Sequence, residues 1–443
     1  MTERINYMVQ GMIDKIPLWF AIPFLLMLLC IAVGPLLFNH WWEKNKNKLI
    51  VSIVLGVPVA ILLLANRMGH ELLHQIVFDY VPFIVLLGSL FIITGGIHLE
   101  GDIKAKPSIN TLFLAIGGVL ASLMGTTGAA MLLIRPVIKT NSERHYNVHT
   151  ILFFIAIVAN AGGLLTPLGD PPLFLMYLRG TPFTWFLSMA KEWAFVLALL
   201  LLIYFIVDSY YYKKESRADI QDDETHVVPI SLKGIINFIF LLGVVLSVAF
   251  LNEQFIPAIG KNHSIGFIRE AAIALCAVLS LIITSKKVRY EDNKFTWGPI
   301  VEVAFLFLGI FITMVPALIY LRENAQSLGL DKPAQFYYSV GVLSSFLDNA
   351  PTAVSFYNLA LGMVPSVGEA KLVAGIPEIL LSAICLGSVL FGAMTYIGNG
   401  PNFMVKAIAE ENGIKMPGFF VYIYKFSLVV LLPVYIITQL LFL

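Results

Sequence analysis

The sequence predicts an all-α polytopic membrane protein built from two halves that are inverted repeats of each other. Hydrophobic residues make up 58% of the 443 residues and charged residues only 13%, whereas soluble domains carry about 25% charged residues. In addition, a helix-breaking pattern of Pro, Gly and amide residues occurs twice inside apolar segments, at 160–174 and at 395–404. We therefore expect an integral, multi-pass protein of the plasma membrane (bacterial inner membrane), surrounded by the lipid bilayer.

The expected spans are apolar segments that can place about 20 residues in the hydrocarbon core. Two of them, 149–179 and 374–402, contain the helix-breaking pattern and are therefore expected as broken helices. The ten spans are expected at 17–38, 49–66, 78–98, 149–179, 185–210, 233–254, 267–284, 299–321, 374–402 and 419–442.

Two more apolar segments, 107–138 and 333–362, have glycine-rich or polar centres. Each is long enough for two half-helices joined by a tip, and a polar tip at membrane depth must be covered by protein. We favour a re-entrant hairpin for each segment, with one ordinary span as the alternative.

Each half then holds five spans and one hairpin. The first repeat is 1–212, the second is 233–443, and the charged segment 213–232 is the expected cytoplasmic linker. Five crossings invert the second repeat relative to the first, as in many secondary transporters. The distribution of Lys and Arg places both termini outside, so the first hairpin enters from the cytoplasm and the second from outside.

The two breaks share residue types at one constant offset. Thr166 and Thr395, Gly169 and Gly398, Asp170 and Asn399, Pro172 and Pro401, and Phe174 and Phe403 are all 229 residues apart. Proline removes a backbone donor and glycine loosens the backbone. Paired breaks in two halves of a membrane protein indicate a transporter binding site.

Two acids lie in these interrupted segments, Asp170 in the first break and Asp348 at the second hairpin tip. A carboxylate inside the bilayer is costly unless it is paired or hydrated, and it indicates an ion or proton site. Such a group can exchange H⁺ for a cation, so we predict Na⁺ binding and proton coupling at Asp170 and Asp348. Glu302 is a third candidate for proton coupling, with a position at the membrane interface as the alternative.

Polar residues that can supply hard oxygen ligands accompany the acids. Hydroxyls and amides at the tips and breaks complete the predicted ion-binding set, which comprises Thr126, Thr127, Asn160, Thr166, Asp170, Asp348, Asn349, Thr352, Asn399 and Asn402. For Thr126 and Thr127, a helix cap is an equally good interpretation. For Asp348 and Asn349, the alternative is an N-cap before Pro351.

The other polar patterns in the sequence are weaker evidence for a functional site. His98, Glu100 and Asp102 could form a proton access route, but we favour a solvated loop. His70, Glu71 and His74 have helical spacing that resembles metal ligands, and we favour a surface helix turn. The sequence contains no P-loop, dinucleotide fingerprint or nucleophile elbow, so we expect no cofactor and no enzymatic activity. A net charge of +1 gives no indication of a nucleic-acid partner.

The strings Gly169-Asp-Pro-Pro172 and Leu347-Asp-Asn-Ala-Pro-Thr352 resemble the ion transporter superfamily, which includes NhaD-type sodium/proton antiporters, arsenite permeases and citrate transporters. The resemblance implies an inverted-repeat fold, a homodimer and a small ion as substrate. Carboxylate transporters of the group have Ser-Asn-Thr-type hairpin tips, whereas this chain has Gly125-Thr-Thr127 and Asp348-Asn-Ala350. An acid at the second tip repels a carboxylate and favours a cation.

Two functions follow. The first is a sodium/proton antiporter. The alternative is a Na⁺- or H⁺-coupled transporter of an anion such as citrate, dicarboxylate or arsenite, since helix N-termini can hold an anion. A channel or a membrane-bound enzyme has no supporting motif. The acids Asp170 and Asp348 favour the antiporter.

Overall fold

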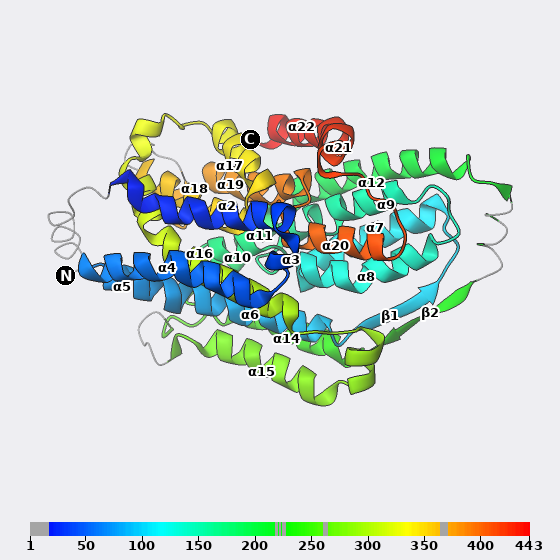
Figure 1. Ribbon diagram of the computed structural model, residues 1–443, viewed down its shortest axis with the longest axis horizontal. Coiled ribbons are helices and arrows are strands. Elements are labelled where there is room, and N and C mark those ends of the chain that lie inside the picture. Colours follow the sequence, from blue (N-terminus) through cyan, green and yellow to red (C-terminus); the bar gives the residue numbers. More distant parts are fainter. Residues whose placement is uncertain (1–16, 218–219, 221–222, 224–226, 260–264, 364–370) are drawn as a thin grey trace.

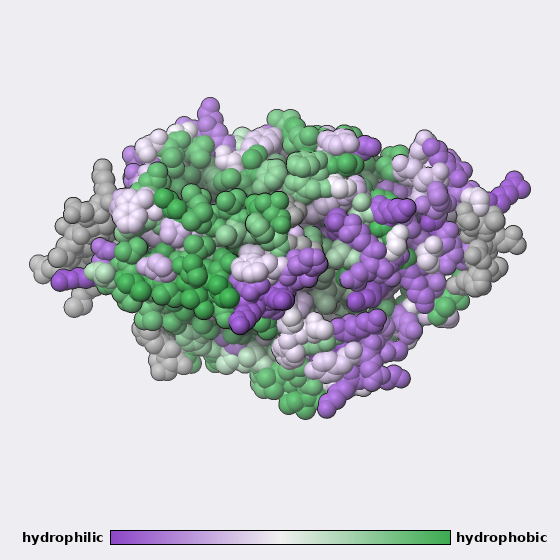
Figure 2. All heavy atoms as spheres, in the orientation of Figure 1, coloured by the Kyte–Doolittle hydropathy of each residue, from purple (hydrophilic) through white to green (hydrophobic). Residues whose placement is uncertain are grey.

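The computed structural model shows a helical protein in which most helices run along the long axis of the molecule (Figure 1). It describes residues 17–217, 220, 223, 227–259, 265–363 and 371–443. Among these, eight helices are long and apolar enough to cross a membrane. Their outward faces carry exposed apolar side chains such as Leu29, Ile61 and Leu440. Hydrophobic residues cover much of the left and middle of the surface shown in Figure 2. The predicted class, an all-α polytopic membrane protein, is confirmed.

The first half of the chain contains the elements up to β2. They are η1 (Leu18–Ala21), α2 (Ile22–Leu37), α3 (Asn39–Trp42), α4 (Asn45–Ala65), α5 (Gly69–His74), η2 (Gln75–Tyr80), α6 (Val81–Thr94), β1 (His98–Asp102), α7 (Pro107–Met124), α8 (Thr126–Thr140), α9 (Val148–Ile157), η3 (Ala161–Leu165), α10 (Pro171–Leu178), α11 (Phe183–Ser188), α12 (Ala190–Tyr212) and β2 (Val228–Lys233).

The second half repeats much of this order. Its elements are α14 (Ile236–Phe250), α15 (Ile268–Ile283), η5 (Lys287–Asp292), α16 (Gly298–Glu323), η6 (Ala325–Leu328), α17 (Pro333–Phe346), α18 (Asn349–Met363), β3 (Leu372–Val373), β4 (Ile376–Pro377), α19 (Glu378–Phe391), η8 (Gly392–Met394), α20 (Gly400–Glu411), α21 (Phe419–Tyr422), η9 (Ile423–Leu431) and α22 (Leu432–Phe442).

Both expected hairpins are present as helix pairs. In the first, Gly125 alone separates α7 from α8, and the two helices pack on each other. Gly125 has φ +80°, which glycine adopts without the steric penalty of a side chain. In the second, α17 and α18 are also in contact and are separated by Leu347 and Asp348. The helix α7 is long enough to cross a membrane by itself, but its contact with α8 makes the pair a hairpin.

The hairpins approach the centre of the molecule from opposite ends. In Figure 1, α7 and α8 occupy the right half, and α17 and α18 the left half.

The first and second halves of the chain pack against each other through equivalent pairs of helices. The helix α6 contacts α15 while α16 contacts α4, and α10 contacts the hairpin helix α18 while α20 contacts the hairpin helix α8. These contacts between the halves bring the two hairpin tips and the two helix breaks together at the centre of the molecule.

Three details differ from the sequence-based expectation. The predicted solvated loop at His98–Asp102 is the strand β1, which pairs antiparallel with β2 in the predicted linker. The part of the linker at 218–219, 221–222 and 224–226 lies outside the described residues. The expected spans at 233–254 and 267–284 are the 15-residue α14 and the 16-residue α15. The expected broken span 374–402 extends further than predicted, because α20 begins in the second break at Gly400, continues to Glu411 and packs on α8 and α9.

Candidate functional site

Four helices begin at the centre of the molecule, and each begins at an interruption that the sequence predicts. They are α8 at Thr126, α10 at Pro171, α18 at Asn349 and α20 at Gly400. The first N–H groups of a helix have no partner within it, and the N-terminus carries roughly half a positive charge. Four such ends together create a site that stabilises negative charge.

Asp170 is the negative group at this site. Its side chain is almost fully buried, with 2% of its surface exposed. The Oδ1 atom accepts hydrogen bonds from Thr126 Oγ1 at 3.0 Å and from Asn399 Nδ2 at 3.1 Å. The Oδ2 atom accepts one from Asn349 Nδ2 at 2.6 Å. The carboxylate thus joins the first break to both hairpin tips and to the second break. We call Asp170, Thr126, Asn349 and Asn399 the Asp170 cluster.

Two more predicted amides surround the cluster. Asn399 Nδ2 also lies 3.2 Å from Asn160 Oδ1, and Asn160 donates to Asn402 Oδ1 at 2.7 Å. Asn402 in turn donates to the carbonyls of Gly392 and Thr395, at 2.8 and 2.9 Å. All three amides are buried. These hydrogen bonds connect the first break to the second. They also pair backbone carbonyls that the interrupted helices leave without a partner.

Thr166 holds the first break against its hairpin. Its hydroxyl donates to the carbonyl of Ser122 just before the tip, and Thr395 donates in the same way to the carbonyl of Ser345. Ser122 returns a bond to the carbonyl of Gly162. The sequence indicated Thr166 as an ion ligand, whereas its hydroxyl makes a structural contact in this conformation. The serines were not predicted, although the threonine repeat was the available signal.

Glycine permits this close contact. A Cβ on Gly169 would lie 2.0 Å from the carbonyl oxygen of Gly163, and a Cβ on Gly398 would lie 2.6 Å from that of Gly392. Both distances are shorter than real side chains tolerate. In addition, the N–H of Thr126 donates to the carbonyl of Gly169 at 2.8 Å. The two glycines of the repeat are therefore required for the interrupted segments to fold onto themselves.

Asp348 lies beside the cluster but turns back toward its own helix. Its Oδ1 accepts the N–H of Ala350 at 3.0 Å, the contact that an N-cap makes. Its side chain is half-buried, and it directly precedes Asn349, which bonds Asp170. Thr352 is buried and donates to the carbonyl of Asp348 at 2.8 Å. The cap interpretation therefore describes this contact, and cation binding by Asp348 stays a prediction.

Two predicted site residues lie apart from the cluster. Thr127 is exposed, unlike its neighbour Thr126. Glu302 lies near the start of α16 and pairs with Lys48 of α4 at 2.7 Å. This pairing corresponds to the alternative of a position near the membrane interface. Proton coupling by Glu302 stays a prediction.

Metal-like spacing does not lead to a metal site. Within the described parts of the chain, no group of three or more His, Cys, Asp or Glu side chains is arranged to hold a metal ion. His70, Glu71 and His74 are exposed on the short helix α5, in agreement with the favoured surface turn.

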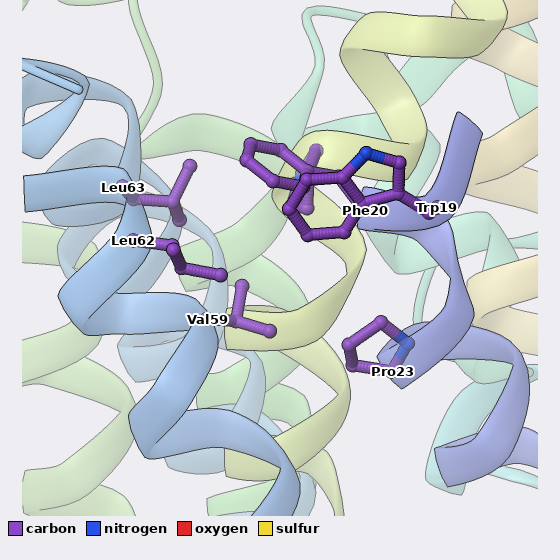
Figure 3. Close-up of a pocket in the computed structure, with 7 residues that line it drawn as sticks. Trp19, Phe20, Pro23, Val59, Leu62 and Leu63 are labelled. Carbon is purple, nitrogen blue, oxygen red and sulfur yellow. The ribbon is translucent and has the colours of Figure 1, made fainter. Parts of the chain in front are cut away.

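A small cavity of about 30 Å³ between α2, α4 and α16 is lined by Trp19, Val59 and other uncharged side chains (Figure 3), and it offers nothing to bind an ion.

Comparison with known proteins connects this architecture to transport. Residues 13–443 match the family described as "Putative citrate transport". An uncharacterized transporter of Mycobacterium tuberculosis is 25% identical over 401 residues, which cover 84% of this chain and 88% of the relative, and one of Mycobacterium bovis matches equally. The inner membrane protein YbiR of Escherichia coli is 27% identical over 132 residues, which cover 27% of this chain and 36% of that protein.

The family match covers nearly the whole chain, and the apolar helices fit it. The chain therefore belongs to the putative citrate transport family, and it is an integral, multi-pass membrane transporter.

Proposed function

We propose that this transporter is a secondary active sodium/proton antiporter in which Na⁺ and H⁺ bind in turn at Asp170. The observation that carries the proposal is the buried carboxylate held by three donors from three separate interrupted segments, Thr126, Asn349 and Asn399. A buried carboxylate of this kind is a strong ligand for a cation or a proton.

The cluster can serve both ions with the same side chains. A protonated Asp170 gains a donor, so one surrounding group must become an acceptor. The amides of Asn349 and Asn399 can do so by turning, since each carries an oxygen as well as an NH₂ group. The same turn presents amide oxygens to Na⁺, a hard cation that prefers oxygen ligands. Exchange at Asp170 would then need only side-chain rotation and ion access.

Electrostatics favours a cation over an anion at this position. The four helix N-termini stabilise negative charge, but Asp170 itself already supplies that charge. A substrate anion would also face Asp348, and two like charges about 4 Å apart repel by roughly 4 kcal/mol at an effective dielectric constant near 20.

The second candidate is a Na⁺- or H⁺-coupled transporter of an anion such as citrate. Two observations favour it: the description of the family and the four helix N-termini, which are well suited to anionic groups. In this function Asp170 would bind the coupling cation, and the anion would bind beside it.

One assay separates the two candidates. Purified protein in proteoliposomes is given a pulse of Na⁺, Li⁺ or K⁺ while a trapped dye reports internal pH, and labelled citrate uptake is measured in parallel with and without a Na⁺ gradient. We expect Na⁺-driven proton movement without citrate. Citrate uptake driven by Na⁺, with no proton movement in its absence, would replace the antiporter by the second candidate.

A further inference from the structure

A large open cavity lies away from the Asp170 cluster, where α8 and α20 end. Its volume is about 760 Å³, and its wall includes Arg135, Lys139, Arg144, His145 and Lys415. No acidic side chain is among the residues that line it. Figure 2 shows hydrophilic residues gathered over the half of the molecule that contains these helix ends. A concave surface lined by one sign of charge concentrates ions of the opposite sign.

Arg144 forms the buried part of this wall, with 5% of its surface exposed. Asp208 lies behind it, 2.7 Å from Nη1, and Glu215 lies 3.6 Å from Nε. These acids hold the guanidinium in place, yet Nε and Nη2 are both buried without a hydrogen-bond partner. Buried donors nearly always have partners, so the free Nη2 indicates that this arginine is built to receive an additional acceptor.

The remaining cations are exposed and available. Arg135, Lys139 and Lys415 have exposed side chains, and in the described parts of the chain none of them pairs with a carboxylate. The acid next in sequence, Glu143, accepts a hydrogen bond from Ser142 at 2.9 Å and does not line the cavity. Four Arg and Lys side chains line the cavity, and only two acids, Asp208 and Glu215, lie behind Arg144, so the net charge of this region is positive.

We propose that this cavity binds an anion with two or more oxyanion groups, phosphoryl or carboxylate, held by Arg144 at the wall and by Lys139 and Lys415 at the rim. Charge-assisted hydrogen bonds to such groups are the strongest that side chains make. Lys139 belongs to the first half of the chain and Lys415 to the second, and α8 and α20 both begin at the Asp170 cluster. A bound anion therefore connects the far ends of two helices that build the ion site. This proposal does not depend on which ion is transported.

The anion has two possible sources, a soluble polyanion or the headgroup of an anionic phospholipid. Pyrophosphate is the soluble probe, measured through the thermal unfolding of the full-length protein in a neutral detergent. For the lipid, the protein is placed in nanodiscs of phosphatidylcholine with or without phosphatidylglycerol, and native mass spectrometry counts the retained lipids. Stabilisation by pyrophosphate identifies the soluble source, and retention of phosphatidylglycerol identifies the lipid.

The double variant Lys139→Ala/Lys415→Ala tests the assignment without disturbing the buried ion pairs of Arg144. We expect it to weaken binding of the responding probe at least tenfold, because each lysine removed takes away a charge-assisted hydrogen bond to the anion. The matched control is Lys46→Ala/Lys286→Ala, which removes two exposed lysines outside the cavity and should leave binding unchanged. Failure of both probes to bind, or equal weakening by the two double variants, would overturn the proposal.

Discussion

At the scale of single residues, Asp170 holds the site together and is also its proposed ion ligand. Its carboxylate accepts bonds from Thr126, Asn349 and Asn399. Asn has nearly the same shape as Asp but carries no charge, so Asp170→Asn separates the two roles. A neutral amide can keep one or two of these bonds by turning, but it can neither exchange a proton nor balance a cation.

We therefore expect Asp170→Asn to abolish Na⁺-driven proton movement while the protein remains folded and inserted. The measurement is the Na⁺-induced pH change in proteoliposomes, with size-exclusion behaviour as the folding check. Asn399→Asp is the complementary change, because it places a second carboxylate 3.1 Å from the first. Two close carboxylates titrate as a coupled pair, so this variant should shift the pH dependence of transport. Full exchange by Asp170→Asn would refute the assignment.

Asp348 allows the cap and the ion-binding roles to be separated. Asn caps a helix about as well as Asp, whereas Ala costs roughly 1 kcal/mol. Asp348→Asn should therefore keep the stability of α18 but lower the apparent Na⁺ affinity, because one negative charge beside Asp170 is lost. Asp348→Ala should lower both. The apparent Na⁺ affinity and the melting temperature of each variant decide this, and a wild-type affinity in Asp348→Asn would leave Asp348 as a cap only.

At the scale of elements, each break must fold tightly against a hairpin tip, and glycine makes this possible. A Cβ on Gly398 would lie 2.6 Å from the carbonyl oxygen of Gly392 and 2.7 Å from that of Ser344. Gly400, two residues later, has no heavy atom within 4 Å of its added Cβ. The two positions therefore form a matched pair in the same break.

We expect Gly398→Ala to lower the melting temperature by several degrees and to reduce transport, because the alanine forces the break away from α17. Gly400→Ala should change neither quantity by more than a small amount. Thermal unfolding in detergent and the proteoliposome assay measure the two effects. Equal stability of the two variants would mean that the second break is not packed as tightly as the structure has it.

Most elements could be predicted because membrane spans and their interruptions are local properties of the sequence. Apolar length gives the spans, and Gly125 and the segment from Asp348 to Pro351 give the hairpin tips. The strands β1 and β2 could not be predicted in this way. They pair His98 with Lys233 across the whole first hairpin and broken span, and Val228–Lys233 includes a proline that disfavours a strand. Their stability comes from tertiary contacts that no local pattern contains.

The site was predicted as a set of residue types, but its geometry was not. At the second hairpin tip, the sequence favoured Asp348 over Asn349 as the main site residue, because an acid at membrane depth is costly unless it has a function. In the structure Asn349 reaches Asp170 instead, since consecutive residues at a helix start point in different directions. Likewise, Glu302 lies in an apolar run, but only the fold places Lys48 of α4 beside it.

At the scale of the whole molecule, the two hairpins approach the Asp170 cluster from opposite ends, although both tips contact the same carboxylate. If the second half is inverted in the membrane, as the odd number of spans predicts, the base of the first hairpin faces the cytoplasm and that of the second faces outside. Alternating access requires one binding site that can open to either side of the membrane. Two hairpins that meet at one carboxylate, with their bases on opposite sides of the membrane, provide this arrangement.

Labelling from the two sides of the membrane tests this orientation. Lys139 at the base of the first hairpin and Asp331 just before the second are both exposed. We expect Asp331→Cys to react with a membrane-impermeant maleimide added to intact cells, and Lys139→Cys to react only after the membrane is opened. The unsubstituted chain is the blank, because Cys30, Cys276 and Cys385 lie within the apolar helices α2, α15 and α19. Labelling of both positions from the same side would exclude inverted halves, and the Asp170 cluster would then need a different route for its ions.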